Sequence, residues 1–472
     1  MDDLWYRSAG DLAAAIRRRE LSAREVVQAH LTRIEQTNPA VNAVATLVPE
    51  RALAEADAAD AALSGRTGGG PTGPLHGLPV LHKDTHETAG IRTTYGSPLF
   101  ADRVPDFDEL VIERLRAAGT VALGKSNVPE FAAGAHTFNE VFGTTRNPYD
   151  PGRSAGGSSG GAAAALACGM TPLADGSDLG GSLRYPASFC NVVGLRPSPG
   201  RVPTWPAQAA WSTMSVQGPM GRSVADTALM LSAIAGPDPR SPIALETPGS
   251  DFAVPLDRDL SGLRVAWTPD LDGAVAVEPQ VVQALEPQLK VFADLGCEVE
   301  QACPDFSGAD EVFRILRGWL FELRLGALVE RHRDRIKPSV VWNVEVGRDL
   351  TGSDIARAEV LHTRLFHRVR EFFERYDVLL LPVSQVPPFD ARLEYPTTIQ
   401  GVEQETYLDW MRSAYWVSAT GCPALSVPGG FTEDGLPVGL QVVGPHHADL
   451  RVLQVGHAFE QATGVALRRP PL

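Results

Sequence analysis

The 472-residue chain has few cysteines, no long apolar run and no basic leader. No stretch approaches the roughly 18 to 20 uninterrupted apolar residues that a membrane-spanning helix needs. The N-terminus begins acidic and turns basic, the reverse of a signal peptide. The five cysteines are odd in number and never form a CxxC pair, so neither a disulfide framework nor a zinc knuckle is predicted. These absences favour a cytoplasmic protein whose cysteines are buried, reduced thiols.

A positively charged surface is also missing. Acidic residues outnumber basic ones by 57 to 42, which gives a net charge of −15, and no basic run or basic-aromatic stripe occurs. Proteins that bind nucleic acid or anionic membranes depend on such positive surfaces. We therefore expect neither nucleic acid nor membrane among the partners of this chain.

Lysine is scarce as well. Only four of the 42 basic side chains are lysines, namely Lys83, Lys125, Lys290 and Lys337. Arginine keeps its proton near neutral pH, whereas a desolvated lysine can lose it. Each lysine is therefore a candidate for a role that an arginine cannot fill.

What is present is a globular composition with 44 % apolar and 21 % charged residues. Length alone allows about three domains, but large α/β enzymes often form one unit. Segments with helical period alternate with short runs typical of buried strands, which predicts an α/β layered fold. The expected helices lie at about 22–37, 50–63, 108–118, 162–168, 223–236, 277–295, 309–333, 353–375 and 449–462, and the expected strands lie within 75–87, 120–127, 263–270, 376–384, 424–431 and 436–444.

Local signals set several of these boundaries. Ser22 and Glu25 form a capping box, and Asn38-Pro39 is expected to end that helix. The Gly/Pro/Thr stretch 64–74 is interpreted as a flexible connector that leads into a strand with Lys83 at its end. The last two strands are expected to form a hairpin that turns on Asp434-Gly435.

Two glycine-serine loops lie close together in the sequence, at 156–161 and 176–182. Glycine lets backbone N–H groups turn toward one point, as an oxyanion hole requires. Such loops are more often linkers or phosphate cradles, but the first loop lacks the GK[ST] ending of a P-loop and no GxGxxG fingerprint is present. The residues alone leave a catalytic role and a structural one about equally supported.

The run over 152–203, GRSAGGSSGGAAAALACGMTPLADGSDLGGSLRYPASFCNVVGLRPSPGRVP, closely resembles the amidase signature family of serine hydrolases. The family's serine pair corresponds to Ser158 and Ser182, which are 24 positions apart. GLPVLHKD resembles the strand that carries the family's catalytic lysine, here Lys83. GKSNVPEF, GTTRNPYD, YDVLLLPVS and GCPALSVPGGF followed by LPVGLQVVG extend the likeness over essentially the whole chain.

The resemblance implies the α/β amidase signature fold, a large mixed central β-sheet covered by helices on both faces. It implies a single domain over 1–472, with N-terminal helices at about 1–63, a catalytic core at about 75–245 and 376–472, and a variable helical region on the substrate side at about 277–375.

The resemblance also implies a Ser-cisSer-Lys triad that works without a cofactor. Ser182 would be the nucleophile, Ser158 the proton relay after a cis peptide, and Lys83 the base. The backbone N–H groups of Leu179, Gly180, Gly181 and Ser182 would line the oxyanion hole. The chemistry agrees, because a serine attacks an amide poorly until a base takes its proton, and a lysine brought from about 10.4 to roughly 7 or 8 could do so.

Other polar residues near these loops have structural interpretations. His82 and His86 have HxxxH spacing, but on an extended segment without a third ligand we expect no metal site. Asp178 and Arg184 are expected to form an ion pair that braces the nucleophile loop. No role is assigned to Asp175.

The remaining lysines are expected to be structural. Lys125 is predicted to form structural hydrogen bonds, whereas Lys290 and Lys337 are predicted to be solvated.

The sequence therefore predicts an enzyme that cleaves an amide C–N bond through an acyl-enzyme, as a monomer or homodimer acting on a small molecule. Substrate contacts are expected from Gly134, Trp205 and Trp211, and the aromatic content of the variable segments favours neutral aryl or alkyl amides. The alternatives are a carbamate-cleaving enzyme (urethanase) or aryl acylamidase, the glutaminase component of a tRNA-dependent amidotransferase, and an inactive binding protein.

Overall fold

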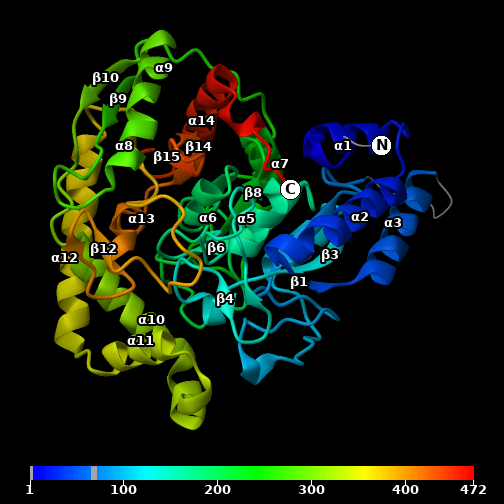
Figure 1. Ribbon diagram of the computed structural model, residues 1–472, viewed down its shortest axis with the longest axis horizontal. Helices are drawn as coiled ribbons and strands as arrows, with labels where there is room; N and C mark the ends of the chain where they lie inside the picture. The colour runs from blue at the N-terminus through cyan, green and yellow to red at the C-terminus, as the bar shows by residue number, and fades with distance from the viewer. Residues whose placement is uncertain (1–3, 65–71) are drawn as a thin grey trace.

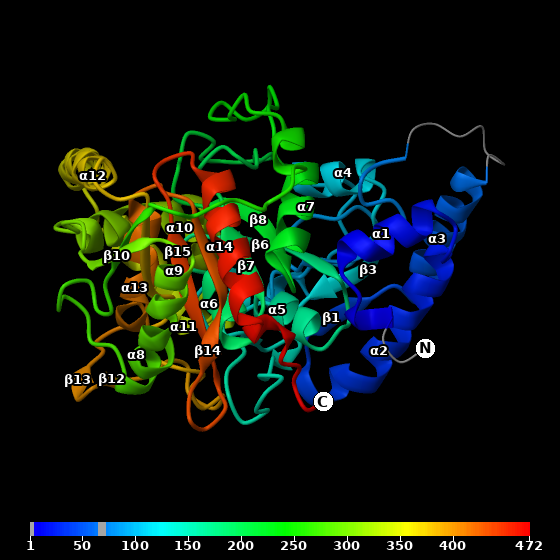
Figure 2. The same ribbon diagram turned by 90° about the horizontal axis from the view of Figure 1, so that it is seen from above.

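An 11-stranded mixed sheet runs through the molecule in the order β1-β3-β2-β6-β8-β7-β14-β15-β11-β9-β10 (Figures 1 and 2). The computed structural model describes residues 4–64 and 72–472, so most of the predicted connector at 64–74 lies outside the described residues. The strands are β1 Val44–Leu47, β2 Pro79–Lys83, β3 Val121–Ser126, β6 Leu173–Asp178, β7 Val193–Arg196, β8 Val216–Gly221, β9 Arg264–Trp267, β10 Glu298–Gln301, β11 Val378–Pro382, β14 Ala424–Phe431 and β15 Pro437–Val443. Two small ribbons, β4 Phe138–Asn139 with β5 Gly143–Thr144 and β12 Thr398–Ile399 with β13 Val402–Glu403, stand apart from it.

Helices cover both faces of this sheet, as predicted (Figures 1 and 2). They are α1 Ala9–Arg17, α2 Ala23–Val41, α3 Pro49–Leu63, α4 Leu110–Ala117, α5 Gly160–Ala167, α6 Arg184–Phe189, α7 Val224–Ile234, α8 Pro279–Leu285, α9 Leu289–Asp294, α10 Ala309–His332, α11 Pro338–Arg348, α12 Gly352–Phe372, α13 Arg412–Ala419 and α14 Asp449–Thr463. Within the described part of the chain, no helix combines the length and apolarity needed to cross a membrane.

The hairpin β14–β15 shows how alternating residues serve the two faces. Leu425 lies opposite Val442 in the antiparallel register, and the Leu425 side chain packs close to Gly456 of α14. Gly439, on the other face of β15, comes so close to Ser188 of α6 that a Cβ would lie 2.6 Å from the Ser188 Cβ. Because successive strand residues point to opposite faces, α14 and α6 pack on opposite sides of the same hairpin.

Most predicted elements are confirmed, and the exceptions have local causes. The capping box of Ser22 and Glu25 is present, but α2 continues through Pro39 to Val41 and ends at Asn42, which is left-handed with φ 51°. Proline removes only one helical hydrogen bond this close to the helix end, so the prediction that Asn38-Pro39 stops the helix was wrong.

Several elements were not predicted, and one expected helix is divided. The expected helix over 277–295 is divided into α8 and α9 by a 3₁₀ turn, Glu286–Gln288, which contains a proline. The strands β1, β6, β7, β8 and β10 of the main sheet and the helices α6, α11 and α13 were missed. The strand β10 is largely exposed at the sheet edge and lacks the apolar run that marks a buried strand.

The cysteines agree with the predicted reduced state. All five are free thiols; Cys168, Cys190, Cys297 and Cys422 are buried, and Cys303 is half-buried.

Candidate active site

Lys83 ends the buried strand β2, and its ammonium group lies among three serine hydroxyls. Nζ is 2.8 Å from Ser158 Oγ, 2.9 Å from Ser159 Oγ and 3.0 Å from Ser177 Oγ. The side chain is 0 % exposed. Burial lowers the pKa of Lys83 from 10.5 to about 7, although Asp178 and Asp175 act in the opposite direction. A lysine with this pKa is substantially neutral at physiological pH and can accept a proton from a neighbouring hydroxyl.

Ser158 lies in the first glycine-serine loop, which packs tightly against the segment 135–136. The Gly157–Ser158 peptide is cis, and Gly156 has a φ of +75°, which favours glycine. A Cβ on Gly157 would lie 3.0 Å from the backbone of Ala135 and His136. The loop therefore packs too tightly against the segment 135–136 to accommodate a side chain at this position.

The second loop follows β6 and is held from inside by Asp178. Its Oδ1 accepts the N–H of Gly181 at 2.9 Å and its Oδ2 accepts the N–H of Leu183 at 3.1 Å. The two loops are joined directly, because Ser159 N donates to the carbonyl oxygen of Ser182 at 3.2 Å. Lys83 and Ser158 are thus brought together from separate segments, and the backbone of Ser182 is bonded to the loop that carries Ser158.

The hydrogen bond to Asp178 corrects the predicted set of oxyanion-hole donors. The N–H of Gly181 is engaged in bracing the loop, so it is not free to face an oxyanion in this conformation. The N–H groups of Leu179, Gly180 and Ser182 have no acceptor among the described residues. Three of the four predicted donors therefore remain available.

The predicted ion pair between Asp178 and Arg184 is present, with Nη2 2.9 Å from Oδ1, and Arg196 joins it at 3.2 Å. All three side chains are 0 % exposed. Burial acts to raise the pKa of Asp178, but attraction to the two arginines outweighs it and holds the pKa well below its usual range. The loop is therefore fixed by a fully ionised carboxylate.

Asp175, to which the sequence assigned no role, organises the other side of Lys83. Its carboxylate accepts from His82 Nδ1 at 2.5 Å, from His86 Nδ1 at 2.7 Å and from the backbone N–H of Lys83 at 2.9 Å. Burial acts to raise the pKa of Asp175, but the two imidazoles outweigh it and the pKa lies well below its usual range. Both histidines of the HxxxH pair are thus bonded to a carboxylate, and the described residues contain no cluster suited to a metal ion.

We expect Asp175→Asn to weaken both the fold and the activity. An amide offers one acceptor oxygen where three N–H groups now bond to a carboxylate, so a buried donor would face an NH₂ group. The melting temperature should fall by several degrees, and kcat/KM should fall about tenfold. Loss of the negative charge should also lower the pKa of Lys83, because Asp175 acts to raise it. The midpoint of the pH–rate profile should therefore move below about 7.

Asp226→Asn is the matched control for this variant. Asp226 is another buried carboxylate and accepts the N–H of Ala9 at 2.8 Å. Its substitution should lower the melting temperature without moving the midpoint. If both variants leave the midpoint in place, Asp175 does not act through Lys83.

The predicted substrate contacts have different surroundings. Gly134 immediately precedes the segment 135–136 that packs on Gly157, and a Cβ on Gly134 would lie 3.9 Å from the Tyr407 ring. Trp205 is half-buried, with the Arg240 guanidinium 4.7 Å from its ring centre, and Trp211 is 78 % exposed. Among the described residues, no hydrogen bond or ring contact links either indole to the lysine–serine cluster. Only Gly134 lies directly beside the candidate site.

The other three lysines lie in different surroundings: one is buried, one is exposed and one is mostly buried against expectation. Lys125 bonds to the carbonyl of His86 and to Thr88 Oγ1, which confirms its structural role. Lys290 is exposed, as predicted, and pairs with Asp294. The prediction for Lys337 was wrong.

Lys337 is only 12 % exposed, because it pairs with Glu394 at 2.8 Å and lies 4.1 Å from the ring centre of Phe138. Contacts so distant in sequence leave no local signal around position 337.

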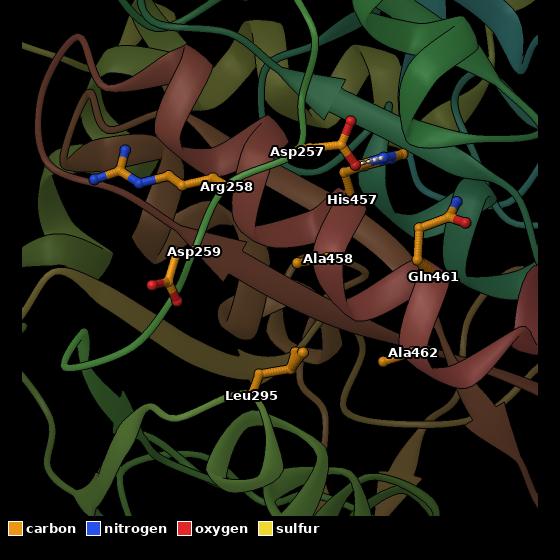
Figure 3. Close-up of a pocket in the computed structure, with 8 residues that line it drawn as sticks. All are labelled: Asp257, Arg258, Asp259, Leu295, His457, Ala458, Gln461 and Ala462. Atoms are coloured by element: carbon orange, nitrogen blue, oxygen red, sulfur yellow. Dashed lines mark ion pairs between the residues drawn. The ribbon is translucent and has the colours of Figure 1, made fainter.

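A separate surface hollow of about 560 Å³ lies between α14 and the segment 257–259 (Figure 3). Asp257 and His457 form an ion pair across it at 3.8 Å. None of the lysine–serine cluster lines this hollow.

The mixed sheet and the buried lysine–serine cluster define a hydrolase-like site in which a lysine is the candidate base. The model of the family described as Amidase matches residues 25–453. The chain belongs to the amidase family, the amidase signature enzymes.

Individual relatives cover the chain almost completely. It is 35 % identical to an acylamidase of Rhodococcus erythropolis over 99 % of this chain and 98 % of that protein. It is 38 % identical to the A component of the glutamyl-tRNA(Gln) amidotransferase of Thermus thermophilus, over 98 % of this chain and 99 % of that protein. The solved structure of a bacterial aryl acylamidase of the same family superposes with a TM-score of 0.90 at 29 % identity, covering 98 % of this chain and 99 % of that one.

Proposed function

We propose that this protein hydrolyses aryl or alkyl amides through an acyl-enzyme on Ser182. The observation that carries the proposal is the hydrogen bond between Lys83 Nζ and Ser158 Oγ, 2.8 Å long and shielded from solvent, on a loop bonded to the backbone of Ser182. A base, a relay hydroxyl and a second, partly exposed serine are what acyl transfer requires.

In the first half of the reaction, Ser182 Oγ attacks the amide carbon while its proton passes to Ser158 Oγ and the Ser158 proton passes to Lys83 Nζ. The negative charge that develops on the carbonyl oxygen is stabilised by the free N–H groups of Leu179 and Gly180. Collapse of this intermediate breaks the C–N bond, and the proton returns through Ser158 to the departing nitrogen. The amine leaves, and Ser182 carries the acyl group as an ester.

In the second half, a water molecule attacks the ester carbon and gives its proton to the same relay. The carboxylic acid leaves, and Ser182 recovers its proton. The balance needs only water as co-reactant, so the proposal includes no cofactor.

Support for amides with aromatic or alkyl groups comes from the helix α10. Phe313 and Phe321 are buried on this helix, and a Cβ on Gly180 would lie 2.7 Å from the Phe313 ring. An apolar wall beside the nucleophile loop suits such groups. The likeness to an acylamidase agrees with this choice.

Glutamine hydrolysis is the second candidate, because the Thermus thermophilus amidotransferase component is as similar to this chain as the acylamidase is. The deciding measurement is kcat/KM for an acyl anilide, glutamine and the matching carbamate on the isolated chain. We expect the anilide to be cleaved at least about tenfold faster than glutamine, and the carbamate more slowly than the anilide. Faster ammonia release from glutamine would overturn the proposal. The Ser182→Ala protein, which lacks the proposed nucleophile, serves as the inactive control.

A further inference from the structure

Arg317 of α10 is a buried cation that has no carboxylate partner in the described part of the chain. Its side chain is 5 % exposed. Nε donates to Asn343 Oδ1 at 3.1 Å and Nη2 donates to the Tyr407 hydroxyl at 2.7 Å. Across residues 4–64 and 72–472, no Asp or Glu lies within ion-pair distance of it. Buried arginines are nearly always paired with an anion, so this one requires an explanation.

The cluster has more hydrogen-bond donors than acceptors. Asn343 uses both amide hydrogens, on Ser339 O at 2.6 Å and on the Tyr407 oxygen at 2.5 Å. The Tyr407 oxygen therefore accepts from both Asn343 and Arg317, and its own proton has no acceptor in the described structure. The Nη1 group of Arg317 is likewise without an acceptor among the described residues. A positively charged group surrounded by unused donors favours an anionic acceptor.

Two neighbours connect this cluster to the surroundings of the catalytic loops. Phe313, one turn before Arg317 on α10, packs on Gly180 of the nucleophile loop. The Tyr407 ring lies near Gly134, where an added Cβ would be 3.9 Å from it, and Gly134 precedes the segment that supports Gly157. A helical step of four residues spans about 6 Å, so the guanidinium lies roughly one turn away from the contact with Gly180.

The walls of the cluster are aromatic. The Arg317 guanidinium lies 4.4 Å from the ring centre of Phe321 and 5.9 Å from that of Phe313. Such surroundings hold the planar cation by stacking and exclude water, which strengthens its interaction with an anion.

We propose that Arg317 and Tyr407, positioned by Asn343, bind a carboxylate on the acyl part of the substrate. The substrates would be amides formed from one end of a short dicarboxylic acid, with the amide carbonyl at the nucleophile loop and the free carboxylate about one helical turn away. This inference rests on the proposed amide hydrolysis and restricts it, because the acyl group is then anionic instead of neutral. Glutamine also carries a free carboxylate at this end of its acyl chain, but its ammonium group on the adjacent carbon would lie near the guanidinium and repel it.

The test compares three anilides of similar length: the monoanilide of glutaric acid, its methyl ester, and pentananilide. The wild-type protein should cleave the monoacid at least about tenfold faster than pentananilide in kcat/KM, with the ester between them. Arg317→Met should lower kcat/KM for the monoacid about 100-fold, mainly through KM, and leave pentananilide within about threefold.

Two further variants keep the test decisive. Tyr407→Phe preserves the ring and should lower kcat/KM for the monoacid alone, by about tenfold. Arg331→Met removes an exposed arginine from the same helix, one that bonds only to Ala327 O among the described residues, and should change none of the three rates. If the Arg317→Met protein does not fold, the rates of the Tyr407→Phe protein on the three anilides decide whether the carboxylate site exists.

The possible failures can be told apart. Equal cleavage of all three anilides by the wild-type protein, or an equal loss on all three in Arg317→Met and Tyr407→Phe, would overturn the carboxylate site and leave the proposed amidase intact. Absence of aniline release from every substrate, together with no labelling of Ser182 by a fluorophosphonate, would overturn the proposed function and this inference with it.

Discussion

Replacing Ser182 with alanine is expected to lower turnover of an acyl anilide by ~10⁴-fold or more, because the reaction loses the atom that forms the acyl-enzyme. The substitution removes one oxygen from a partly exposed position. The backbone bonds that join the loops, including Ser159 N to the carbonyl of residue 182, remain possible. The melting temperature should therefore stay close to that of the wild-type protein.

A serine-directed fluorophosphonate gives an independent readout. Mass spectrometry of the labelled wild-type protein should place one adduct on Ser182, and the Ser182→Ala protein should remain unlabelled. Ser177→Ala is a useful control, because Ser177 contacts Lys83 and is also partly exposed but is not the proposed nucleophile. Labelling that persists at full yield in the Ser182→Ala protein would disprove the assignment.

Replacing Lys83 with arginine should be about as damaging as replacing it with methionine. An arginine keeps the positive charge but does not lose its proton near neutral pH, so it cannot act as a base. We expect either variant to lose ~10³-fold or more in kcat. An Lys83→Arg protein that retained more than a few per cent of wild-type activity would show that Lys83 acts only through its charge.

The pH dependence provides a second test of Lys83. Its neutral form is the active one, so kcat/KM should rise with pH through about 7 and then level off. The lowered pKa of Lys83 also affects stability. Because its pKa in the folded protein lies below the value of 10.5 in the unfolded chain, the unfolded chain holds more protons between these two pH values. The free energy of unfolding therefore rises with pH across this window. The Lys83→Met substitution removes the cost of burying this lysine, so the variant should melt no lower than the wild-type protein at pH 7. An unchanged melting temperature would show that the lost activity comes from lost chemistry and not from unfolding.

The local structure was largely predictable from the sequence. Helix caps such as Ser22 with Glu25, and the hairpin turn at Asp434-Gly435, depend on residues a few positions apart. The motifs that contain Ser158, Ser182 and Lys83 indicated these residues as candidates, and the structure places Lys83 Nζ 2.8 Å from Ser158 Oγ. Local signals failed at five strands of the main sheet, including the exposed β10, and at helices such as α11. They also failed at Pro39, where the position within the helix decided the outcome.

The sequence by itself therefore determined the fold class, the positions of most helices and of six strands of the main sheet, and the residue types available for chemistry. Propensity, capping and hydrophobic period act over a few neighbouring residues, so they are visible in the sequence. Only the tertiary structure decided which of these residues meet. Asp175 reaches His82 across 93 positions because β6 lies beside β2 in the sheet, and Arg317 reaches Tyr407 across 90 positions where the segment around residue 407 meets α10. Burial then set the pKa of Lys83 and left Arg317 without a carboxylate among the described residues, since both depend on the surrounding packing and not on the adjacent sequence.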